Sequence, residues 1–574
     1  MAARPWVTSY QDGVPASLEP YPSTSMYQIL SNAAARFPGA TATVFFGGRL
    51  TYVQLLAEVD RFSRALASLG IGKGDRVGLI LPNCPQYVIA YYAALRLGAV
   101  IVGNNPLYSE RELQHQLTDA GIEVCVVLDS LYPKFAAVRD ASGIRTTIVA
   151  KVTDYMGPVL KRLAPIELRR EAKREGHPWP PVPAGADVRW WRELMSSPGP
   201  EVPAAEIDPG VDLAGLIYTG GTTGLSKGAM LTHANLVANL LQCEAWFMGV
   251  RPGDEAVMCV LPFFHSYGMT IGMNLGIHLG AKLILVPRFE LKQTLKAVQK
   301  ERASLFPGVP RLYIAINESP LTPKYHLESI RRCVSGAAPL PVAVARKFES
   351  ITGGRLVEGY GLTETSPVTH ANPLDGRARP GSIGLPIPDT DCRLVDLDDW
   401  TKEAPPGEPG ELAIAGPQVM QGYWNRPEET AAMIRQDADG TRWLLSGDIA
   451  TVSEDGFFSI VDRKKDMIIV SGFNVYPTDI EQVLYHHPKI EKVCVVGVPD
   501  DRTGEAVKAF VVLKRGQTAT PEEIVAFCRD PKQGLTGYRV PSRVEFRDQL
   551  PETLVGKVLR RVLLAEELSA ADRS

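Results

Sequence analysis

Short apolar runs alternate with segments of helical periodicity through the first half of the chain. Residues 43–46 are β-branched and aromatic, residues 52–69 carry apolar side chains at helical spacing, and residues 76–81 form another apolar run. The same rhythm returns after residue 212. Apolar runs that alternate with helices are typical of a parallel sheet covered on both faces. The pattern therefore predicts an α/β fold with doubly wound sheets.

The pattern changes near residue 462. A hairpin expected at residues 449–461 is followed by a charged break, Asp462-Arg-Lys-Lys-Asp466. Beyond it we expect a compact α+β region, with strands at 467–470, 493–498 and 506–513 and helices at 477–487 and 521–529. The break predicts a boundary between a large N-terminal domain, residues 1–464, and a small C-terminal domain, residues 465–574.

Composition and charge are those of a globular protein. The chain has 574 residues, 45% of them hydrophobic and 22% charged, and its formal net charge is -3. This balance gives no electrostatic reason to expect a nucleic-acid partner. The eight cysteines include no Cys-x-x-Cys pair, which disfavours a disulfide framework or a zinc site and fits a reducing cytosol. We expect neither a signal peptide nor a membrane span, and therefore a cytoplasmic protein.

One segment, residues 156–183, departs from the alternating pattern. It is rich in proline and arginine, and its basic residues lie near apolar ones. A solvated surface excursion is the simpler interpretation, and peripheral contact with a membrane is the other. Four acids within or beside it weaken the second interpretation; they are Asp154, Glu167, Glu171 and Glu175.

A glycine-rich loop, Tyr218-Thr-Gly-Gly-Thr-Thr-Gly-Leu-Ser-Lys-Gly228, follows a run that predicts a buried strand. A helix is expected to begin near Thr232. Glycines let backbone N–H groups approach an anion, threonine hydroxyls donate and lysine adds charge, so the loop suits a phosphate. A flexible surface turn is the alternative. Because Gly228 rather than Ser or Thr follows Lys227, the loop lacks the magnesium-binding hydroxyl of nucleotide triphosphatases, and a magnesium ligand must come from elsewhere.

Further short motifs follow the loop. Among them are Leu261-Pro-Phe-Phe-His-Ser-Tyr-Gly268, Ser335-Gly-Ala-Ala-Pro339 and Glu358-Gly-Tyr-Gly-Leu-Thr-Glu364. Later come Ser446-Gly-Asp448, Ser471-Gly-Phe-Asn-Val-Tyr-Pro477 and Leu550-Pro-Glu-Thr-Leu-Val-Gly-Lys-Val-Leu-Arg560. Taken alone, residues 335–339 would be an ordinary loop, His265 would more often be a core histidine, and Lys557 would be a solvated charge. A solvated turn would not explain the Tyr-Gly pair next to Thr-x-Glu in residues 358–364.

In this order, the motifs resemble those of the adenylate-forming superfamily, which includes acyl-CoA synthetases, peptide-synthetase adenylation domains and beetle luciferases. The resemblance covers residues 24–563. The glycine loop departs from the usual form at Gly220, where serine is usual, and at Ser226, where proline is usual. Its Thr-Gly-Gly variant is similar to that of bacterial long-chain fatty acyl-CoA ligases.

For the nucleotide, the resemblance implies that Tyr360 stacks on adenine, Thr363 contacts the α-phosphate and Glu364 binds magnesium. A carboxylate suits Mg²⁺, which prefers hard oxygen ligands. Asp448 and Arg463 would hold the ribose. The full set expected to bind ATP or AMP is Thr219, Gly220, Gly221, Thr222, Thr223, Gly224, Lys227, Gly336, Ala337, Ala338, Glu358, Gly359, Tyr360, Gly361, Asp448 and Arg463.

The resemblance also implies the residues of catalysis and movement. Lys465 would be the hinge of the C-terminal domain, and the loop with Ser471 and Gly472 would face the thiol substrate. Glu552 replaces a basic residue that is usual near the adenylation lysine. The expected catalytic residues are Lys557, the adenylation lysine, His265, beside the acyl and pantetheine channels, and Thr363 and Glu364.

Taken together, the resemblance implies an ATP-dependent fatty acid–CoA ligase for medium- or long-chain acids, acting through an acyl adenylate. ATP, Mg²⁺ and CoA would take part, and relatives suggest a homodimer. A coumarate-type aryl-acid CoA ligase and a ligase that loads a carrier protein share the motifs. An inactive nucleotide-binding module is a further alternative, against which the joint presence of Glu364, Asp448 and Lys557 argues.

Overall fold

The computed structural model describes residues 4–164, 182, 185, 187–219, 226–500, 502–530, 532, 535, 537–552 and 558–571. The chain divides into two compact units. The larger unit is Met1–Asp391 with Ala415–Leu444, and the smaller unit is Cys392–Ile414 with Leu445–Ser574. The smaller unit thus includes segments before residue 465, and the hinge expected at Lys465 stays a prediction.

Within the described residues of the larger unit, the largest sheet has seven strands in the order β7-β6-β5-β3-β4-β8-β9. Six of these strands run parallel, and β9 pairs antiparallel with β8. The strands are β3 (Arg76–Ile80), β4 (Val100–Gly103), β5 (Val124–Leu128), β6 (Thr146–Ala150), β7 (Val188–Trp190), β8 (Leu213–Thr219) and β9 (Lys227–Thr232). The predicted parallel sheet is confirmed.

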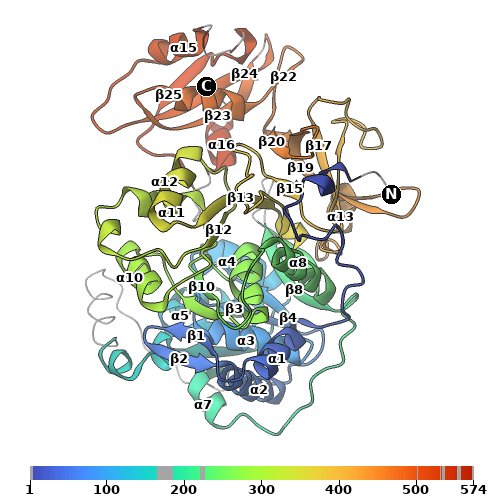
Figure 1. Ribbon diagram of the computed structural model, residues 1–574, viewed down its shortest axis with the longest axis vertical. Coiled ribbons are helices and arrows are strands. Elements are labelled where there is room, and N and C mark those ends of the chain that lie inside the picture. Colours follow the sequence, from blue (N-terminus) through green and yellow to red (C-terminus); the bar gives the residue numbers. More distant parts are fainter. Residues whose placement is uncertain are drawn as a thin grey trace. The chain divides into compact units, whose positions relative to one another are not determined.

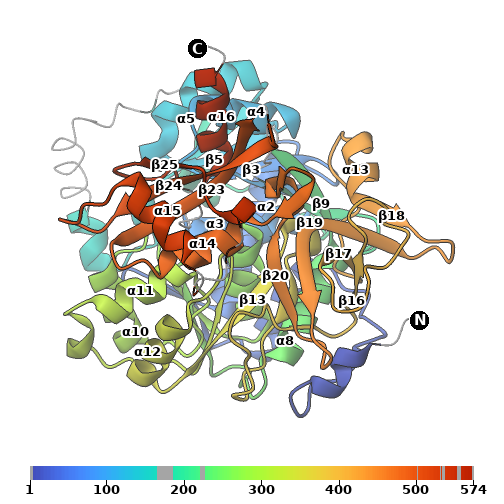
Figure 2. The same ribbon diagram turned by 90° about the horizontal axis from the view of Figure 1, so that it is seen from above.

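Helices cover this sheet on both faces. On one face, α4 and α5 place Leu117 and Phe135 in an apolar cluster with Ile80 of β3, and Figure 2 shows these two helices side by side. Leu79, whose side chain points the other way, is equally buried, and α3 contacts β3 and β4. The helices of this part of the chain are α1 (Met26–Arg36), α2 (Tyr52–Ser68), α3 (Pro85–Arg96), α4 (Glu110–Asp119), α5 (Tyr132–Arg139), α7 (Trp191–Ser196) and α8 (His233–Trp246).

Two four-stranded sheets complete the larger unit (Figure 1). The first has the order β10-β11-β1-β2, with β10 (Ala256–Cys259), β11 (Lys282–Leu285), β1 (Thr41–Phe45) and β2 (Gly48–Thr51). The second has the order β12-β13-β14-β15, with β12 (Arg332–Ser335), β13 (Arg355–Gly361), β14 (Val368–Ala371) and β15 (Leu385–Pro386). The larger unit also contains α9 (Leu275–His278), α10 (Leu291–Glu301), α11 (Pro310–Glu318), α12 (Val342–Thr352) and α13 (Pro427–Met433). It further contains β18 (Ile434–Gln436), which pairs antiparallel with residues 442–444.

The smaller unit also contains two sheets. In one, β19 (Arg442–Val452) lies between β17 (Gly410–Ala415) and β20 (Phe458–Arg463), and β17 continues to β16 (Asp391–Val395). The other has the order β22-β21-β24-β23, with β25 paired to β24. Its strands are β21 (Ile468–Val470), β22 (Phe473–Val475), β23 (Ile490–Asp500), β24 (Gly504–Leu513) and β25 (Arg543–Phe546).

Alternate residues of β23 point into two different apolar layers. Val493 and Val495 pack with α14 (Pro477–Tyr485) and α15 (Pro521–Arg529), whereas Cys494 and Val496 pack with Leu563 of α16 (Arg560–Ala571). The predicted strands and helices of this region are confirmed. The sequence pattern did not predict β22, β25 or α16.

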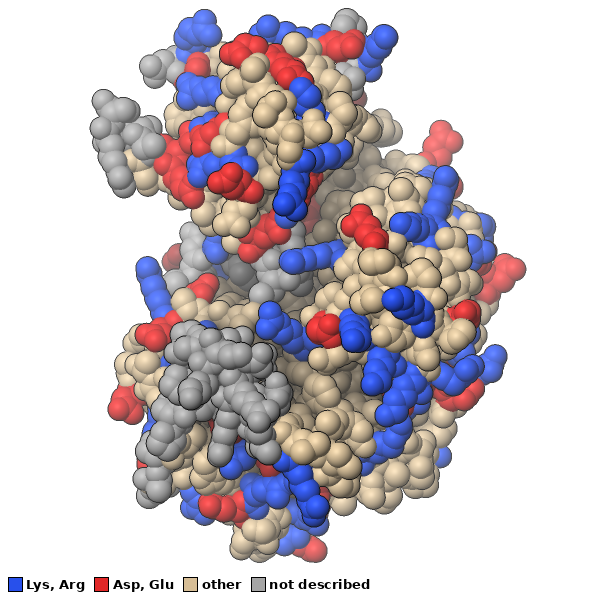
Figure 3. Space-filling view, turned by 90° about the vertical axis from the view of Figure 1, so that its left-hand side faces the viewer, with Lys and Arg blue, Asp and Glu red and all other residues tan. Residues whose placement is uncertain are grey.

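The surface carries both signs of charge. Figure 3 shows acidic and basic side chains interspersed over the face that it presents. No helix within the described parts of the chain is both long enough and apolar enough to cross a membrane.

Candidate active site

The glycine-rich loop joins two antiparallel strands. Thr219, the last residue of β8, pairs with Lys227, the first residue of β9. The helix expected near Thr232 begins at His233, with Thr232 as its N-cap, so a strand separates loop and helix. The predicted strand–loop–helix order was therefore wrong. The predicted residues Gly220, Gly221, Thr222, Thr223 and Gly224 lie outside the described residues.

Lys227 lies near the ring of Tyr423, which in turn contacts Glu364; these three residues form a row. Its Nζ sits 5.2 Å from the ring centroid of Tyr423. The hydroxyl of Tyr423 donates to Oε1 of Glu364 over 2.6 Å. Burial and this carboxylate raise the pKa of Tyr423 far above its usual value, so the hydroxyl keeps its proton. A cation suited to phosphate thus lies one ring away from the predicted magnesium ligand.

Glu364 has the chemistry of a magnesium ligand. It is buried in the turn Thr363–Thr365. Among the described residues, Oε2 accepts no hydrogen bond, which leaves that oxygen for a cation. The same part of the chain holds no group of three or more His, Cys, Asp or Glu side chains that could bind a metal. One carboxylate suffices for Mg²⁺, because phosphate and water complete its shell.

The segment around His265 contacts the neighbouring motif. Oγ of Ser266 lies 3.3 Å from Oγ1 of Thr363. Nδ1 of His265 accepts the N–H of Tyr267 over 3.2 Å, so the proton of a neutral imidazole resides on Nε2. The His265 side chain is exposed to solvent, yet the protein packed around it lowers its pKa below the usual value of 6.5. The ring is therefore neutral at pH 7. His265 is therefore a hydrogen-bond donor through Nε2.

The two motifs predicted to hold adenine are adjacent. β12 and β13 run parallel and place Ser335 opposite Glu358. Ala337 follows β12 with φ of 66°, a left-handed conformation that costs energy for a residue with a Cβ. A Cβ on Gly336 would lie 3.1 Å from the ring of Tyr267, so any larger residue would crowd that ring. Ala338 continues this turn.

Tyr360 belongs to β13, which pairs with β14 along its other edge. It pairs with His370 of β14, and the two rings meet edge to face with centroids 5.8 Å apart. A Cβ on Gly361 would lie 1.9 Å from the carbonyl oxygen of Pro367, and one on Gly359 would lie 2.8 Å from Val334. Only glycine fits at residue 361, because β14 passes too close for a side chain.

Glu358 is a half-buried acid beside these residues. Its Oε2 accepts the N–H of Leu340 over 3.0 Å. Burial raises the pKa of Glu358 from 4.5 to about 7, and the Leu340 hydrogen bond offsets only part of that shift.

The two predicted ribose ligands form an ion pair in the smaller unit. Asp448 of β19 lies opposite Arg463 of β20. Nε of Arg463 lies 2.8 Å from Oδ1 of Asp448, whose side chain is 3% exposed. The antiparallel register therefore explains why residues 15 positions apart act as neighbours.

The motif predicted to face the thiol substrate is a two-residue hairpin turn. Ser471 and Gly472 connect β21 to β22 with φ of 52° and 82°. Two successive positive φ values match a type I′ turn, which suits the twist of a hairpin. A Cβ on Gly472 would meet no described atom within 4 Å, so glycine serves the backbone conformation there. Lys465 lies in the preceding turn, Lys464–Asp466.

Lys557, the predicted adenylation lysine, lies outside the described residues. The residues that flank its segment are paired, Glu552 with Val558 in an isolated bridge, and the N–H of Leu559 donates to Pro551 over 2.8 Å. The carboxylate of Glu552 pairs with Lys492 of β23. The acid that replaces a usual basic residue is thus neutralised locally.

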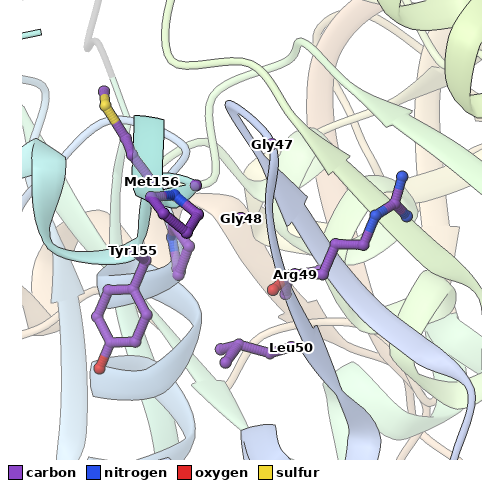
Figure 4. Close-up of a pocket in the computed structure, with 10 residues that line it drawn as sticks. Gly47, Gly48, Arg49, Leu50, Tyr155 and Met156 are labelled. Carbon is purple, nitrogen blue, oxygen red and sulfur yellow. The ribbon is translucent and has the colours of Figure 1, made fainter. Parts of the chain in front are cut away.

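Tyr423 and Tyr267 are site residues that the sequence did not indicate. Tyr423 lies outside the motifs, and its role depends on tertiary contact with Glu364. Tyr267 lies within a motif, but its contact with Gly336 spans two distant segments. A cavity of about 290 Å³, shown in Figure 4, is elsewhere; Gly48, Arg49 and Tyr155 help to line it, and none of the predicted site residues does.

Known families match both parts of the chain. The AMP-binding enzyme family matches residues 30–424, and the AMP-binding enzyme C-terminal domain matches residues 479–557. The chain belongs to the AMP-binding enzyme family. The family thus covers the segments from β8 to Tyr423 that carry most of the site of this AMP-binding enzyme.

Relatives of this AMP-binding enzyme extend over its length. A long-chain-fatty-acid–CoA ligase from Bacillus subtilis is 46% identical over 565 residues, 98% of each chain. A feruloyl-CoA synthase from an Amycolatopsis species is 36% identical over 524 residues, 91% of this chain and 95% of that protein. The crystal structure of ATP-bound MatB from Rhodopseudomonas palustris matches with a TM-score of 0.79 at 28% identity, over 95% of this chain and 99% of that one.

Replacing Glu358 by Gln is expected to change how stability depends on pH. The pKa of Glu358 is raised in the folded state, so the folded protein favours the protonated carboxyl. The contribution of this group to the free energy of unfolding is therefore fully present below pH 4.5 and is lost as pH rises through about 7. Glutamine does not titrate. The free energy of unfolding of Glu358→Gln should therefore rise by roughly 1–3 kcal/mol relative to that of the wild type between pH 4.5 and 8. Thermal unfolding of both proteins across this range checks it, and parallel pH profiles would contradict it.

Proposed function

We propose that this AMP-binding enzyme is an ATP-dependent fatty acid–CoA ligase that acts through an acyl adenylate. The observation that carries the proposal is the row formed by Lys227, Tyr423 and Glu364. An ammonium suited to phosphate and a carboxylate suited to magnesium contact the same tyrosine, which supports transfer of a nucleotidyl group. The 46% identity to a long-chain-fatty-acid–CoA ligase supports a fatty acid as the acyl donor.

In the first half-reaction, a carboxylate oxygen of the acid attacks the α-phosphorus of ATP. The bond from that phosphorus to the bridging oxygen of the β-phosphate breaks, and pyrophosphate leaves. Charge spreads over the phosphoryl oxygens, so catalysis depends on positioned donors and cations. Lys227, Thr363 and Lys557 provide these, and Mg²⁺ held by Glu364 would neutralise phosphate charge.

In the second half-reaction, the sulfur of CoA attacks the acyl carbon, the bond from that carbon to the AMP oxygen breaks, and AMP leaves. The open space around Gly472 supports close approach of the pantetheine arm at the hairpin tip. His265 donates through Nε2 and therefore orients a substrate oxygen rather than removing the thiol proton. The thiol can displace AMP because the first half-reaction has already converted a carboxylate oxygen, a poor leaving group, into part of AMP.

The acyl chain is proposed to lie along α8 and the π-helix η5 (Gly268–Asn274), which contact each other. Every residue of η5 is buried, and π-helical turns are frequent at functional sites. Burial of each additional CH₂ contributes about 0.8 kcal/mol. Such a channel favours an alkyl chain over a short acid.

Exchange between ATP and pyrophosphate, measured over a panel of acids, tests the proposed function. Medium- and long-chain fatty acids should support exchange, and each added pair of CH₂ groups should raise kcat/KM by up to about 15-fold until the channel is full. Exchange with only coumarate or ferulate would favour the aryl-acid ligase, which the feruloyl-CoA synthase relative supports. Exchange with no acid would favour an inactive module, and thioester formed on a carrier protein but not on CoA would favour the loading ligase.

The two half-reactions are proposed to use different parts of the C-terminal domain, residues 465–574. Lys557 serves adenylate formation, and the turn at Ser471 and Gly472 serves thioester formation. Their separation along the chain supports a rotation about Lys465 between the steps.

Replacing Lys557 by Ala is expected to separate the two half-reactions. Adenylate formation should fall by about 10²- to 10³-fold, because a positioned cation on the phosphoryl oxygens is lost. Thioester formation from supplied acyl adenylate and CoA should stay within about twofold of the wild type. Rapid-quench measurement of each step checks this, with Lys514→Ala, an exposed lysine of the smaller unit, as control. Equal loss in both steps would contradict the division of labour.

We also propose that the enzyme works in the cytoplasm at a membrane surface, where fatty acids accumulate. The helix at residues 158–164 exposes Val159, Leu160 and Leu163 by 69%, 43% and 56%. Lys161 and Arg162 lie between them. Apolar side chains flanked by cations suit an interface with anionic lipid. The homodimer that the resemblance implies stays a prediction.

Replacing Val159, Leu160 and Leu163 by Ser is expected to weaken binding to phosphatidylglycerol vesicles by about tenfold or more, because apolar burial in the interface is lost. A matched variant replaces three other exposed apolar residues, Val53, Leu107 and Val211, by Ser. Flotation with vesicles measures both variants. Similar binding by both, or no binding by the wild type, would contradict membrane contact through this helix.

A further inference from the structure

Arg560 is the first residue of α16 and makes ion pairs to three different elements. Its Nη2 lies 2.6 Å from Oε2 of Glu481 on α14. Its Nη1 lies 3.4 Å from Oδ2 of Asp466 in the turn Lys464–Asp466 and 3.8 Å from Oδ1 of Asp462 at the end of β20. The planar guanidinium fork can face several carboxylates at once.

This cluster is largely shielded from water. The side chains of Arg560, Glu481 and Asp462 are 22%, 14% and 1% exposed. Burial alone would lower the pKa of Arg560, but Glu481 and Asp462 outweigh it and raise that pKa. Burial raises the pKa of Glu481, an effect that Arg560 partly offsets. Loss of the Arg560 cation would remove a positive charge that all three carboxylates face.

Two of the three carboxylates, those of Glu481 and Asp462, also accept hydrogen bonds from backbone N–H groups. Oε1 of Glu481 accepts the N–H of Val495 on β23 over 2.8 Å. Asp462 accepts the N–H of Arg463 through Oδ1 and the N–H of Thr478 through Oδ2, each over 2.7 Å. Glu481 and Asp462 are therefore held in place, and Arg560 takes its orientation from them.

The residues of the cluster stand close in sequence to the proposed hinge and to the proposed adenylation lysine. Asp462 and Asp466 stand on either side of Lys465, the proposed hinge. Arg560 stands three residues after Lys557, the proposed adenylation lysine. A side chain that holds the start of α16 to the turn around Lys465 thereby connects the lysine segment to the hinge.

We infer that Arg560 is a positioning residue that ties the segment carrying Lys557 to the turn at Lys465, so that the lysine follows the hinge into place for adenylate formation. This inference rests on the proposed function. Arg560 itself does not need to touch substrate, because a displacement of about 1 Å at a reacting group can cost a hundredfold in rate.

A matched pair of variants tests the inference. Arg560→Met removes the cluster's cation, and Arg547→Met removes another ion pair of α16, that between Arg547 and Glu566 at 3.0 Å, away from the hinge turn. Arg560→Met should slow adenylate formation by about 10- to 100-fold and leave thioester formation from supplied acyl adenylate within about twofold. Arg547→Met should leave both steps within about twofold. Each step is measured separately, and thermal unfolding confirms that the variants are folded.

Other outcomes overturn the inference. If Arg560→Met slows both steps equally, or if Arg547→Met reproduces its asymmetry, Arg560 is only a structural ion pair. Should Arg560→Met fail to fold, Arg560→Lys keeps the charge without the fork and is expected to show the same asymmetry at a smaller size; equal effects on both steps would again contradict the inference. Absence of adenylate formation by the wild type with any acid would instead contradict the proposed function.

Discussion

The parallel pairing of β12 with β13 is the constraint on which the nucleotide part of the site depends. Because Ser335 lies opposite Glu358, the residues that follow each strand leave the sheet at the same edge. Parallel strands require a crossover, which α12 supplies. The return of the chain as β14 then passes so close to Gly361 that no side chain fits there. Ligands of open α/β sheets bind at such carboxyl edges.

Local patterns sufficed to predict elements whose signals are short-ranged. Period-2 and helical patterns beyond residue 466 correspond to β23, β24, α14 and α15. The pairing partners were beyond their reach. β1 pairs with β11 from a distant part of the chain, and β9 adds an antiparallel strand between the glycine-rich loop and the expected helix. Register depends on tertiary packing, which a local pattern does not contain.

The candidate site shows the same division. Motifs identified the backbone-defined positions, such as the turn at Ser471 and Gly472 and the glycine at residue 361, because their conformations demand particular residue types. Contacts made by longer side chains were not predictable. Tyr423 reaches Glu364, and Arg560 gathers Glu481, Asp462 and Asp466, only because folding buries these groups together. Buried polar groups require partners, but sequence does not say which ones.

The ion pair between Lys492 and Glu552 has a consequence for how this chain can vary. An acid in place of the usual base at residue 552 is tolerated because β23 supplies a compensating ammonium. Replacing Glu552 alone by a base would set two cations against each other, and changing Lys492 alone would remove the counter-charge that pairs with Glu552. The effect on stability of a substitution at residue 552 therefore depends on the residue at 492, and the reverse also holds. Substitutions at the two positions are expected to occur together.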